Sequence, residues 1–165
     1  SSVMATAKAV PCSCSTALAS VPSAPVMISV MKAEELDRVL EIWLVANEQA
    51  HHFLPEGYWR NFYEDVRAEI GQAEVYVWQE NGQVCGFVGL QKDYLAGLFV
   101  HPTCQGKGVG SDLMQALQQR KKALTLHVFA ENSGAVRFYQ RHGFVITAQQ
   151  EQEDHLEYEM AWQAS

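Results

Sequence analysis

The sequence lacks any long apolar run. Nowhere do about 18 consecutive apolar residues occur, which is roughly the length that a helix needs to cross a bilayer. Positive charge is also scarce, because 12 lysines and arginines face 19 aspartates and glutamates, for a net charge of −7. This balance argues against broad binding to nucleic acid or to an anionic membrane, and we expect neither as a partner. An acidic surface does tolerate a cationic amine or a lysine-bearing protein.

Cysteine is sparse and poorly spaced for metal binding. The four cysteines are Cys12, Cys14, Cys85 and Cys104, and only the first two lie close together, as a Cys-x-Cys pair. A structural zinc site needs a second pair of ligands at similar spacing, and the sequence has none. We expect reduced thiols, no metal site and a cytoplasmic location, and we interpret Cys104 as a structural residue.

The first 26 residues have no aromatic side chain and a single charge, on Lys8. They consist mainly of alanine, serine, proline and valine, which supply too little apolar surface to offset the entropy of ordering. We predict that residues 1–26 are a disordered or non-native extension: a leader, a tag remnant or a translated upstream segment. Residues 27–165 then form one domain, and a chain that is 48% hydrophobic is adequate for its core.

The remaining chain alternates between strand and helix patterns. The turn between the second and third strands is Asn81-Gly82, the pair favoured in two-residue type I′ hairpins. The helix after His51 and His52 is predicted to begin at Pro55. The predicted strands are 27–31, 74–80, 83–91, 94–100, 124–129, 144–150 and 156–162, and the predicted helices are about 33–47, 55–70, 109–122 and 134–141.

The stretch from Tyr94 to Lys122 carries the strongest functional signal. Its strand is apolar nearly throughout and ends at Pro102, which has no N–H to donate. A glycine-bearing loop, Gln105 to Gly110, then leads into the N-terminus of a helix. Unpaired N–H groups and the helix dipole at that point attract an anion such as pyrophosphate. The alternative is a plain tight turn whose glycines only accept a positive φ.

Two nucleotide-binding motifs do not fit this loop. A Walker A loop closes with Gly-Lys-Ser/Thr, which is missing here, and no second acidic signature for Mg²⁺ is present. The glycine spacing also differs from that of a dinucleotide fingerprint, and no repeated strand–helix–strand units support one. We therefore disfavour a nucleotide-binding protein.

A second stretch, from Asn132 to Phe144, weakens the plain-turn alternative. Together the two stretches resemble the GNAT superfamily of acyl-CoA-dependent N-acetyltransferases. The superfamily's loop, Gln/Arg-x-x-Gly-x-Gly/Ala, is matched by Gln105, Gly108 and Gly110. Its second signature, Asn-x-x-Ala-x-x-Phe-Tyr-x-x-x-Gly-Phe, is matched by Asn132, Ala135, Phe138, Tyr139, Gly143 and Phe144. The resemblance covers about 27–162 and is greatest to a small bacterial branch of the superfamily.

The resemblance implies an α/β (α+β) fold. The expected GNAT-like central sheet is mixed and mostly antiparallel, with helices on both faces and a parallel pair formed by the fourth and fifth strands. These two strands are expected to splay apart and to expose unpaired backbone groups. Pantetheine is itself an amide chain, so it can pair with such groups like an added strand. The implied cofactor is acetyl-CoA, with no metal.

The resemblance also implies which residues hold acetyl-CoA. The backbone of Leu98, Phe99 and Val100 would pair with pantetheine, and the N–H of Leu98 would polarise the acetyl carbonyl. Asn132 and Phe138 would add contacts, although Asn132 as a plain helix N-cap and Phe138 as a core residue are the alternatives. The pyrophosphate would lie on the loop residues Gln105, Gly106, Lys107, Gly108, Val109 and Gly110, where Lys107 either adds charge or points to solvent.

Tyr139 is the implied catalytic acid. A phenol is neutral at pH 7 and can donate to a departing thiolate. The alternative is a half-buried aromatic that packs beside Phe138. The base is less well defined, because the fourth strand offers Tyr94 and Ala96 and no carboxylate or imidazole before its end. We predict His51 as the base, because an imidazole titrates in a suitable range; a surface histidine, with the amine losing its proton to solvent, is the alternative.

The acceptor site is predicted to be lined by His52, Phe53, Tyr58 and Tyr94. We expect the acceptor to be a primary amine that attacks directly in a ternary complex. The small bacterial branch favours a protein lysine over a small amine. A non-catalytic acyl-CoA-binding module is the rival outside enzymes, and Tyr139 argues against it because binding alone does not need this residue. We expect a monomer or a homodimer.

Overall fold

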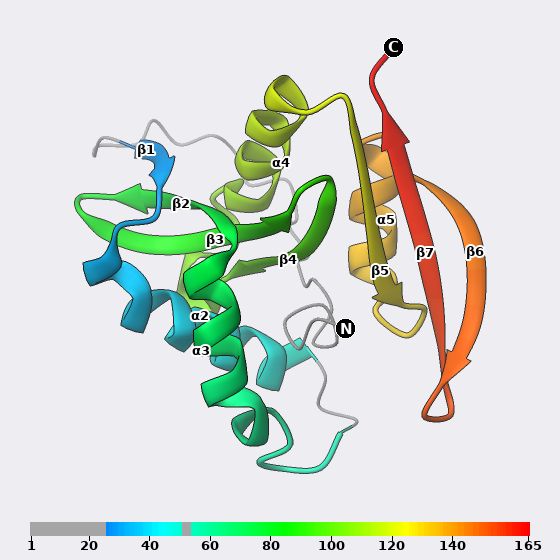
Figure 1. Ribbon diagram of the computed structural model, residues 1–165, viewed down its shortest axis with the longest axis horizontal. Helices are drawn as coiled ribbons and strands as arrows, with labels where there is room; N and C mark the ends of the chain where they lie inside the picture. Colours follow the sequence, from blue (N-terminus) through cyan, green and yellow to red (C-terminus); the bar gives the residue numbers. More distant parts are fainter. Residues whose placement is uncertain (1–25, 51–53) are drawn as a thin grey trace.

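The computed structural model describes residues 26–50 and 54–165. Within them the strands form one seven-stranded sheet in the order β1-β2-β3-β4-β5-β7-β6 (Figure 1). All neighbouring strands are antiparallel except β4 and β5, which are parallel. The strands are β1 (Val26–Val30), β2 (Glu74–Glu80), β3 (Gln83–Gln91), β4 (Tyr94–Val100), β5 (Ala123–Phe129), β6 (Val145–Gln152) and β7 (His155–Gln163). The mixed, mostly antiparallel sheet with a parallel β4/β5 pair confirms the expected fold.

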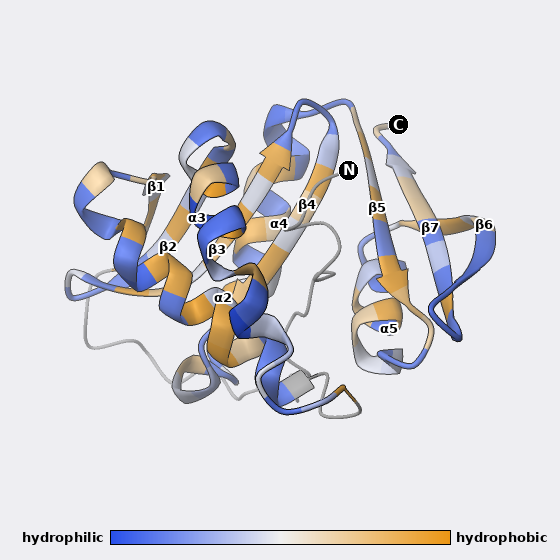
Figure 2. Ribbon diagram, turned by 60° about the horizontal axis from the view of Figure 1, so that its bottom comes forward, coloured by the Kyte–Doolittle hydropathy of each residue, from blue (hydrophilic) through white to orange (hydrophobic). Residues whose placement is uncertain are grey.

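Helices cover both faces of the sheet. The α-helices are α2 (Leu36–Ala50), α3 (Tyr63–Gln72), α4 (Val109–Arg120) and α5 (Ser133–Arg141), and the short 3₁₀ turns are η1 (Ala33–Glu35), η2 (Trp59–Phe62) and η3 (Pro102–Cys104). One hydrophobic cluster joins α2 and α3 to the sheet, and Trp43, Trp59, Phe87 and Phe99 belong to it. The other joins α4 and α5 to the opposite face through Leu113, Tyr139 and Phe144. Figure 2 shows apolar residues along β3 and β4, two strands that contribute to both clusters.

The helix that was predicted to begin at Pro55 begins later. The carbonyl oxygen of Pro55 accepts from the N–H of Tyr58 (3.1 Å), which closes a turn instead of a helix. Gly57 lies inside this turn with φ +81°, a left-handed conformation that interrupts right-handed helix and suits glycine. The 3₁₀ turn η2 therefore starts only at Trp59, and α3 at Tyr63. The prediction of Pro55 as the helix start was wrong because Gly57 sets the local backbone.

The parallel strands β4 and β5 are paired through their backbones at only one position among the described residues. Their ladder among the described residues is the single pair Tyr94 and Thr125, supported by the N–H of Thr125, which donates to the carbonyl oxygen of Asp93 (3.0 Å). Beyond this pair the two strands diverge, as Figure 1 shows. On its other edge β5 pairs with β7 along its whole length, from Ala123 to Phe129. The predicted splay is thus confirmed, and it leaves one edge of β4 without a neighbouring strand.

None of the helices among the described residues is both long and apolar enough to cross a membrane.

Candidate functional site

The unpaired edge of β4 presents the backbone of Leu98 and Val100. The N–H of His101 donates to the carbonyl oxygen of Cys85 (2.8 Å), so these opposite residues form a hydrogen-bonded pair of the β3–β4 ladder. Such pairs alternate along antiparallel strands, and the residues between them turn their N–H and C=O groups to the other side. Leu98 and Val100 are opposite Val88 and Gly86 and occupy these alternate positions. Their backbone groups therefore face the gap toward β5.

Phe99 faces the other way. It lies opposite Phe87 in a position where the backbone bonds to β3, and the two rings pack with their centroids 5.3 Å apart. Its ring also covers the backbone of Gly97, since a Cβ built there would lie 2.2 Å from a Phe99 ring carbon. The structure therefore places Phe99 in the core, with its backbone bonded to β3. The sequence prediction grouped Phe99 with Leu98 and Val100 and did not separate residues whose backbone faces β3 from those whose backbone faces the gap.

A bulge in β4 divides the site between the two faces of the sheet. Gly97 pairs with Gly89 and Leu95 with Leu90, so Ala96 is an extra residue without an opposite number. Before the bulge, the side chains of Tyr94 and Ala96 pack with the α2/α3 cluster. After it, the side chain of Leu98 packs with the α4/α5 cluster. Groups from both faces thus meet at the gap.

The glycine loop contains two glycines in the left-handed conformation and leads directly into α4. Gly106 and Gly108 have φ of +86° and +76°, and the space around an added Cβ is empty at both, so backbone conformation and not crowding demands glycine. Gly108 is the N-cap of α4, and its carbonyl oxygen accepts from the N–H of Asp112 (2.9 Å). The N–H groups ahead of Asp112 belong to the first turn, which has no intrahelical acceptors. Val109 and Gly110 are buried at this turn.

The side chains of the loop are already engaged. The ammonium group of Lys107 lies 2.8 Å from a carboxylate oxygen of Glu80, which raises the pKa of Lys107. The sequence left two alternatives for Lys107, added charge at the anion site or solvent, and the structure gives a third, an ion pair. The amide of Gln105 donates to Gln49 on α2 (2.9 Å).

Asn132 caps α5, and half of its amide remains unpaired. Its side-chain oxygen accepts from the N–H of Ala135 (3.3 Å), as expected for an N-cap. Its buried amide nitrogen has no hydrogen-bond partner among the described residues. At the other end, Gly143 (φ +91°) donates to Gln140 and Phe144 donates to Tyr139, the two bonds of a Schellman motif. Both ends of the helix that carries Tyr139 are therefore fixed locally.

Tyr139 is fully buried, yet its hydroxyl has no hydrogen-bond partner among the described residues. Its ring packs edge-on against Phe138 and Phe144, at centroid distances of 5.4 and 5.6 Å. Burial raises the pKa of Tyr139 well above its ordinary value, and the phenol of Tyr94 adds to the effect. An unpaired buried hydroxyl costs free energy, of the order of 1–3 kcal/mol. Such a group needs an explanation, and a ligand atom that accepts from it would supply one.

Phe138 is buried and lies against His142, with ring centroids 4.6 Å apart. Burial lowers the pKa of His142. The position of Phe138 favours the core interpretation that the sequence left open.

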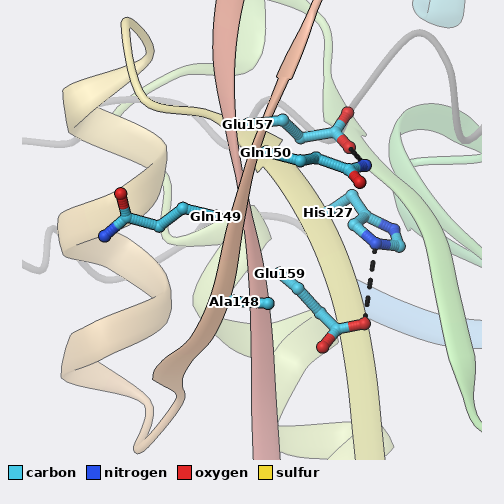
Figure 3. Close-up of a pocket in the computed structure, with 6 residues that line it drawn as sticks. All are labelled: His127, Ala148, Gln149, Gln150, Glu157 and Glu159. Atoms are coloured by element: carbon cyan, nitrogen blue, oxygen red, sulfur yellow. Dashed lines mark hydrogen bonds and ion pairs between the residues drawn. The ribbon is translucent and has the colours of Figure 1, made fainter.

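A cluster that the sequence prediction missed lies on the face of Tyr94. The hydroxyl oxygen of Tyr94 is 2.7 Å from Nδ1 of His127, and Nε2 of His127 is 3.7 Å from a carboxylate oxygen of Glu159. Figure 3 shows the His127 ring and the Glu159 carboxylate turned toward one another, with Glu157 and Gln150 beside them. Alternation gave the needed signal, because His127 shares a face of β5 with Thr125, the partner of Tyr94. The resemblance predicted that the fourth and fifth strands are parallel, but it did not give the register that pairs Tyr94 with Thr125.

The segment before η2 approaches the turn between β6 and β7. Tyr58 is half-buried and packs against Trp59 and Phe62. Burial raises the pKa of Tyr58, and the negative charge of Glu153 in that turn raises it further. The predicted acceptor-site and base residues His51, His52 and Phe53 lie outside the described residues.

Within residues 26–50 and 54–165 no group of three or more histidine, cysteine or acidic side chains is arranged to hold a metal ion.

The comparisons with known proteins agree with this geometry. A sequence profile described as an acetyltransferase (GNAT) domain matches residues 71–146. The chain is 39% identical to the peptidyl-lysine N-acetyltransferase YiaC of Escherichia coli (strain K12) over 122 residues, which are 73% of this chain and 84% of YiaC. It is 31% identical to the peptidyl-lysine N-acetyltransferase YjaB of the same organism, over 73% of this chain and 83% of YjaB.

Solved structures share the fold. The solution structure of apo YjaB from Escherichia coli has a TM-score of 0.74 and 27% identity, and the match covers 86% of this chain and 99% of that one. The PaiA N-acetyltransferase of Thermoplasma acidophilum, solved in complex with coenzyme A, has a TM-score of 0.69 at 16% identity, over 84% of this chain and 99% of that one.

Proposed function

The chain belongs to the GNAT family of acetyltransferases, and from that premise we propose that it transfers the acetyl group of acetyl-CoA to the side-chain amine of a protein lysine. The observation that carries the proposal is the hydroxyl of Tyr139, which is buried and has no hydrogen-bond partner within residues 26–50 and 54–165. Besides burial, the phenol of Tyr94, at the position where β4 pairs with β5, raises the pKa of Tyr139. In a resting protein this arrangement is unfavourable. It becomes favourable when an acceptor atom, such as the thioester sulfur, enters the gap.

The residues around the gap fit acetyl-CoA in three respects. The backbone of Leu98 and Val100 offers N–H and C=O groups to the amides of pantetheine. The first turn of α4, entered through Gly106 and Gly108, offers N–H groups to the pyrophosphate. The amide nitrogen of Asn132 is a second buried donor that has no partner in the part of the chain that the structure describes. When bound, acetyl-CoA supplies an activated acetyl group as a thioester.

We assign the chemical roles to two donors. The N–H of Leu98 donates to the acetyl carbonyl oxygen as negative charge develops there, in the manner of an oxyanion hole. The hydroxyl of Tyr139 donates to the departing sulfur. The raised pKa of Tyr139 makes it a poor acid but keeps it neutral, so it stabilises the thiolate chiefly as a hydrogen-bond donor. The amine attacks directly while both substrates are bound.

The acceptor is proposed as a protein lysine for two reasons. YiaC and YjaB, which match most of this chain, are both named as peptidyl-lysine N-acetyltransferases. Carboxylates also lie near Tyr94: Glu159 is 3.7 Å from His127, and, after burial, the charges of Glu157, Glu159 and Glu69 raise the pKa of Tyr94. These negative charges favour a cationic side chain over a neutral or anionic acceptor.

The proposal is tested by titrating the protein calorimetrically with acetyl-CoA and, separately, with ATP. Lysine-bearing peptides and small amines are then offered as acceptors, and products are identified by mass spectrometry. We expect saturable acetyl-CoA binding, no ATP binding, and a mass increase of one acetyl group on a lysine side chain. Acetylation of small amines with no peptide product would contradict the lysine assignment. Binding of acetyl-CoA without transfer to any amine would support the non-catalytic alternative.

A further inference from the structure

The cluster on the acceptor face has the components of a proton relay. A lysine side chain is an ammonium ion at neutral pH and must lose a proton before its nitrogen can attack. We propose that Tyr94 and His127 carry this proton away, an inference that rests on the proposed function. Tyr94 Oη accepts the proton from the acceptor ammonium, and the hydroxyl proton of Tyr94 passes at the same time to Nδ1 of His127.

The hydrogen bond between the two side chains sets the direction of the relay. Tyr94 Oη and His127 Nδ1 lie 2.7 Å apart, a normal length for a hydroxyl that donates to nitrogen. If Tyr94 donates, neutral His127 carries its proton on Nε2, on the side of Glu159. No lone pair on the ring is then free for the acceptor. The Tyr94 oxygen still has lone pairs, so it is the atom that receives the ammonium proton.

Position makes Tyr94 suitable for contact with the acceptor. It forms the one β4–β5 ladder pair among the described residues, with Thr125. It is the first residue of β4 and lies two residues before the bulge at Ala96. Its phenol is close enough to Tyr139 to affect the pKa of that residue. Tyr139 on α5 and Tyr94 on the opposite face are therefore both placed to act at one site. The reaction requires this, because the amine attacks and the thiolate leaves at the same carbonyl carbon.

The charges around the relay favour its cationic product. Glu159 on β7 faces Nε2 of His127 at 3.7 Å and stabilises the imidazolium that forms. Glu157 on the same strand accepts a hydrogen bond from the side-chain amide of Gln150 on β6 (2.8 Å). Glu69 on α3 adds a third negative charge near Tyr94. With burial, these carboxylates raise the pKa of Tyr94, so the phenol stays protonated and serves as a shuttle.

The proton balance of the step is simple. One N–H bond of the ammonium breaks and one O–H bond forms at Tyr94, while the old O–H bond breaks and an N–H bond forms at His127. The site starts with an ammonium and a neutral imidazole and ends with a neutral amine and an imidazolium, so its total charge is unchanged. Lysine and histidine differ by about 4 pKa units in ordinary surroundings, so the neutral amine is a minority species that must be consumed by attack.

The pH dependence of kcat/KM tests the relay. The wild-type value should reach a plateau well below the ordinary pKa of a lysine side chain, because His127 takes up the proton. In His127→Asn the amine must lose its proton to solvent, so kcat/KM should keep rising toward the ordinary lysine pKa of about 10. We expect a loss of about 1000-fold at pH 7 that narrows to about 5-fold at pH 9.5, in line with general base catalysis. A variant profile parallel to that of the wild type at every pH would overturn the proposal.

Two further variants separate the relay from simple damage to the site. Tyr94→Phe keeps the ring and removes the hydroxyl, and it should show the same pH profile as His127→Asn, with little further loss in the double variant. His155→Asn is the matched control, because His155 also pairs with a carboxylate, that of Glu131, and should keep the wild-type profile. Additive losses from Tyr94→Phe and His127→Asn would contradict a shared relay.

Nitrogen NMR of the imidazole gives a readout without turnover. Neutral His127 should be the Nε2–H tautomer, and its Nδ1 resonance should move on Tyr94→Phe. An Nδ1–H tautomer would overturn the relay. A wild-type protein that binds acetyl-CoA and acetylates no amine would instead remove the proposed function and the relay with it, whereas turnover with unchanged pH profiles removes the relay alone.

Discussion

The ammonium group of Lys107 and the carboxylate of Glu80 lie 2.8 Å apart, and this ion pair crosses from the glycine loop to the end of β2. The loop is the proposed site of the CoA pyrophosphate, so the carboxylate competes with the ligand for the same cation. Both side chains are partly exposed, and the pair adds little to stability.

Glu80→Gln should therefore tighten acetyl-CoA binding. Removal of one negative charge frees Lys107 and lowers repulsion of the pyrophosphate, and we expect about a 3- to 5-fold lower Kd at low ionic strength, shrinking with added salt. Calorimetric titration at two salt concentrations measures it. Glu74→Gln is the matched control, because Glu74 pairs with Lys121 at the far end of β2 and should leave Kd unchanged. Equal affinity for wild type and Glu80→Gln would place Lys107 outside the anion site.

The left-handed backbone at Gly108 should make this position intolerant of a side chain. Gly108→Ala meets no neighbouring atom, so its cost comes from φ of +76° alone, about 1–2 kcal/mol, or a Tm lower by about 2–8 °C. Distortion of the first turn of α4 should also weaken acetyl-CoA binding. Gly71→Ala is the control: it lies in α3 with equally open space and no positive φ, and it should raise stability by about 0.5–1 kcal/mol. A Gly108→Ala protein as stable as Gly71→Ala would show that the loop relaxes to another conformation.

Asn132 should combine two roles that different substitutions separate. Asn132→Asp keeps the oxygen that caps α5 and removes the unpaired N–H₂ donor, so stability should change little while acetyl-CoA affinity falls. Asn132→Ala removes both and should cost about 1 kcal/mol of stability as well. Chemical denaturation and calorimetric titration of the two variants give the comparison. If Asn132→Asp binds acetyl-CoA as the wild type does, Asn132 is a helix cap only.

Local chemistry explains which parts of the fold the sequence predicted. The Asn81-Gly82 turn, whose two residues have φ of 55° and 75°, fixes the β2–β3 hairpin within a few residues, and the glycine loop fixes the start of α4 in the same way. The turn from Pro55 to Tyr58 is also formed by neighbouring residues, and Gly57 lies within it with a positive φ. A glycine near a helix start does not reveal this conformation.

The parts that the sequence did not predict depend on pairing between distant segments. The backbone of Phe99 faces β3 because of the register with Phe87, and the bulge at Ala96 turns Tyr94 to the opposite face from Leu98. His127 lies 33 residues after Tyr94 in the sequence, and the two side chains form a hydrogen bond only because β5 pairs with β4 in this register. No short-range pattern encodes such contacts. Tyr139 could be singled out as the candidate acid because it lies within a signature of nearby positions, Asn132 to Phe144.

The central claim is that the Tyr139 hydroxyl exists for the departing sulfur and not for the fold. The decisive measurement is the single-turnover rate of acetyl transfer by Tyr139→Phe at saturating acetyl-CoA, alongside its free energy of unfolding. Because the buried hydroxyl has no partner in the described part of the chain, its removal should leave stability unchanged or higher by about 1 kcal/mol. The transfer rate should fall by about 10²- to 10⁴-fold. A rate within a few-fold of the wild type would contradict the account, and Tyr139 would then be a core residue without a role in the chemistry.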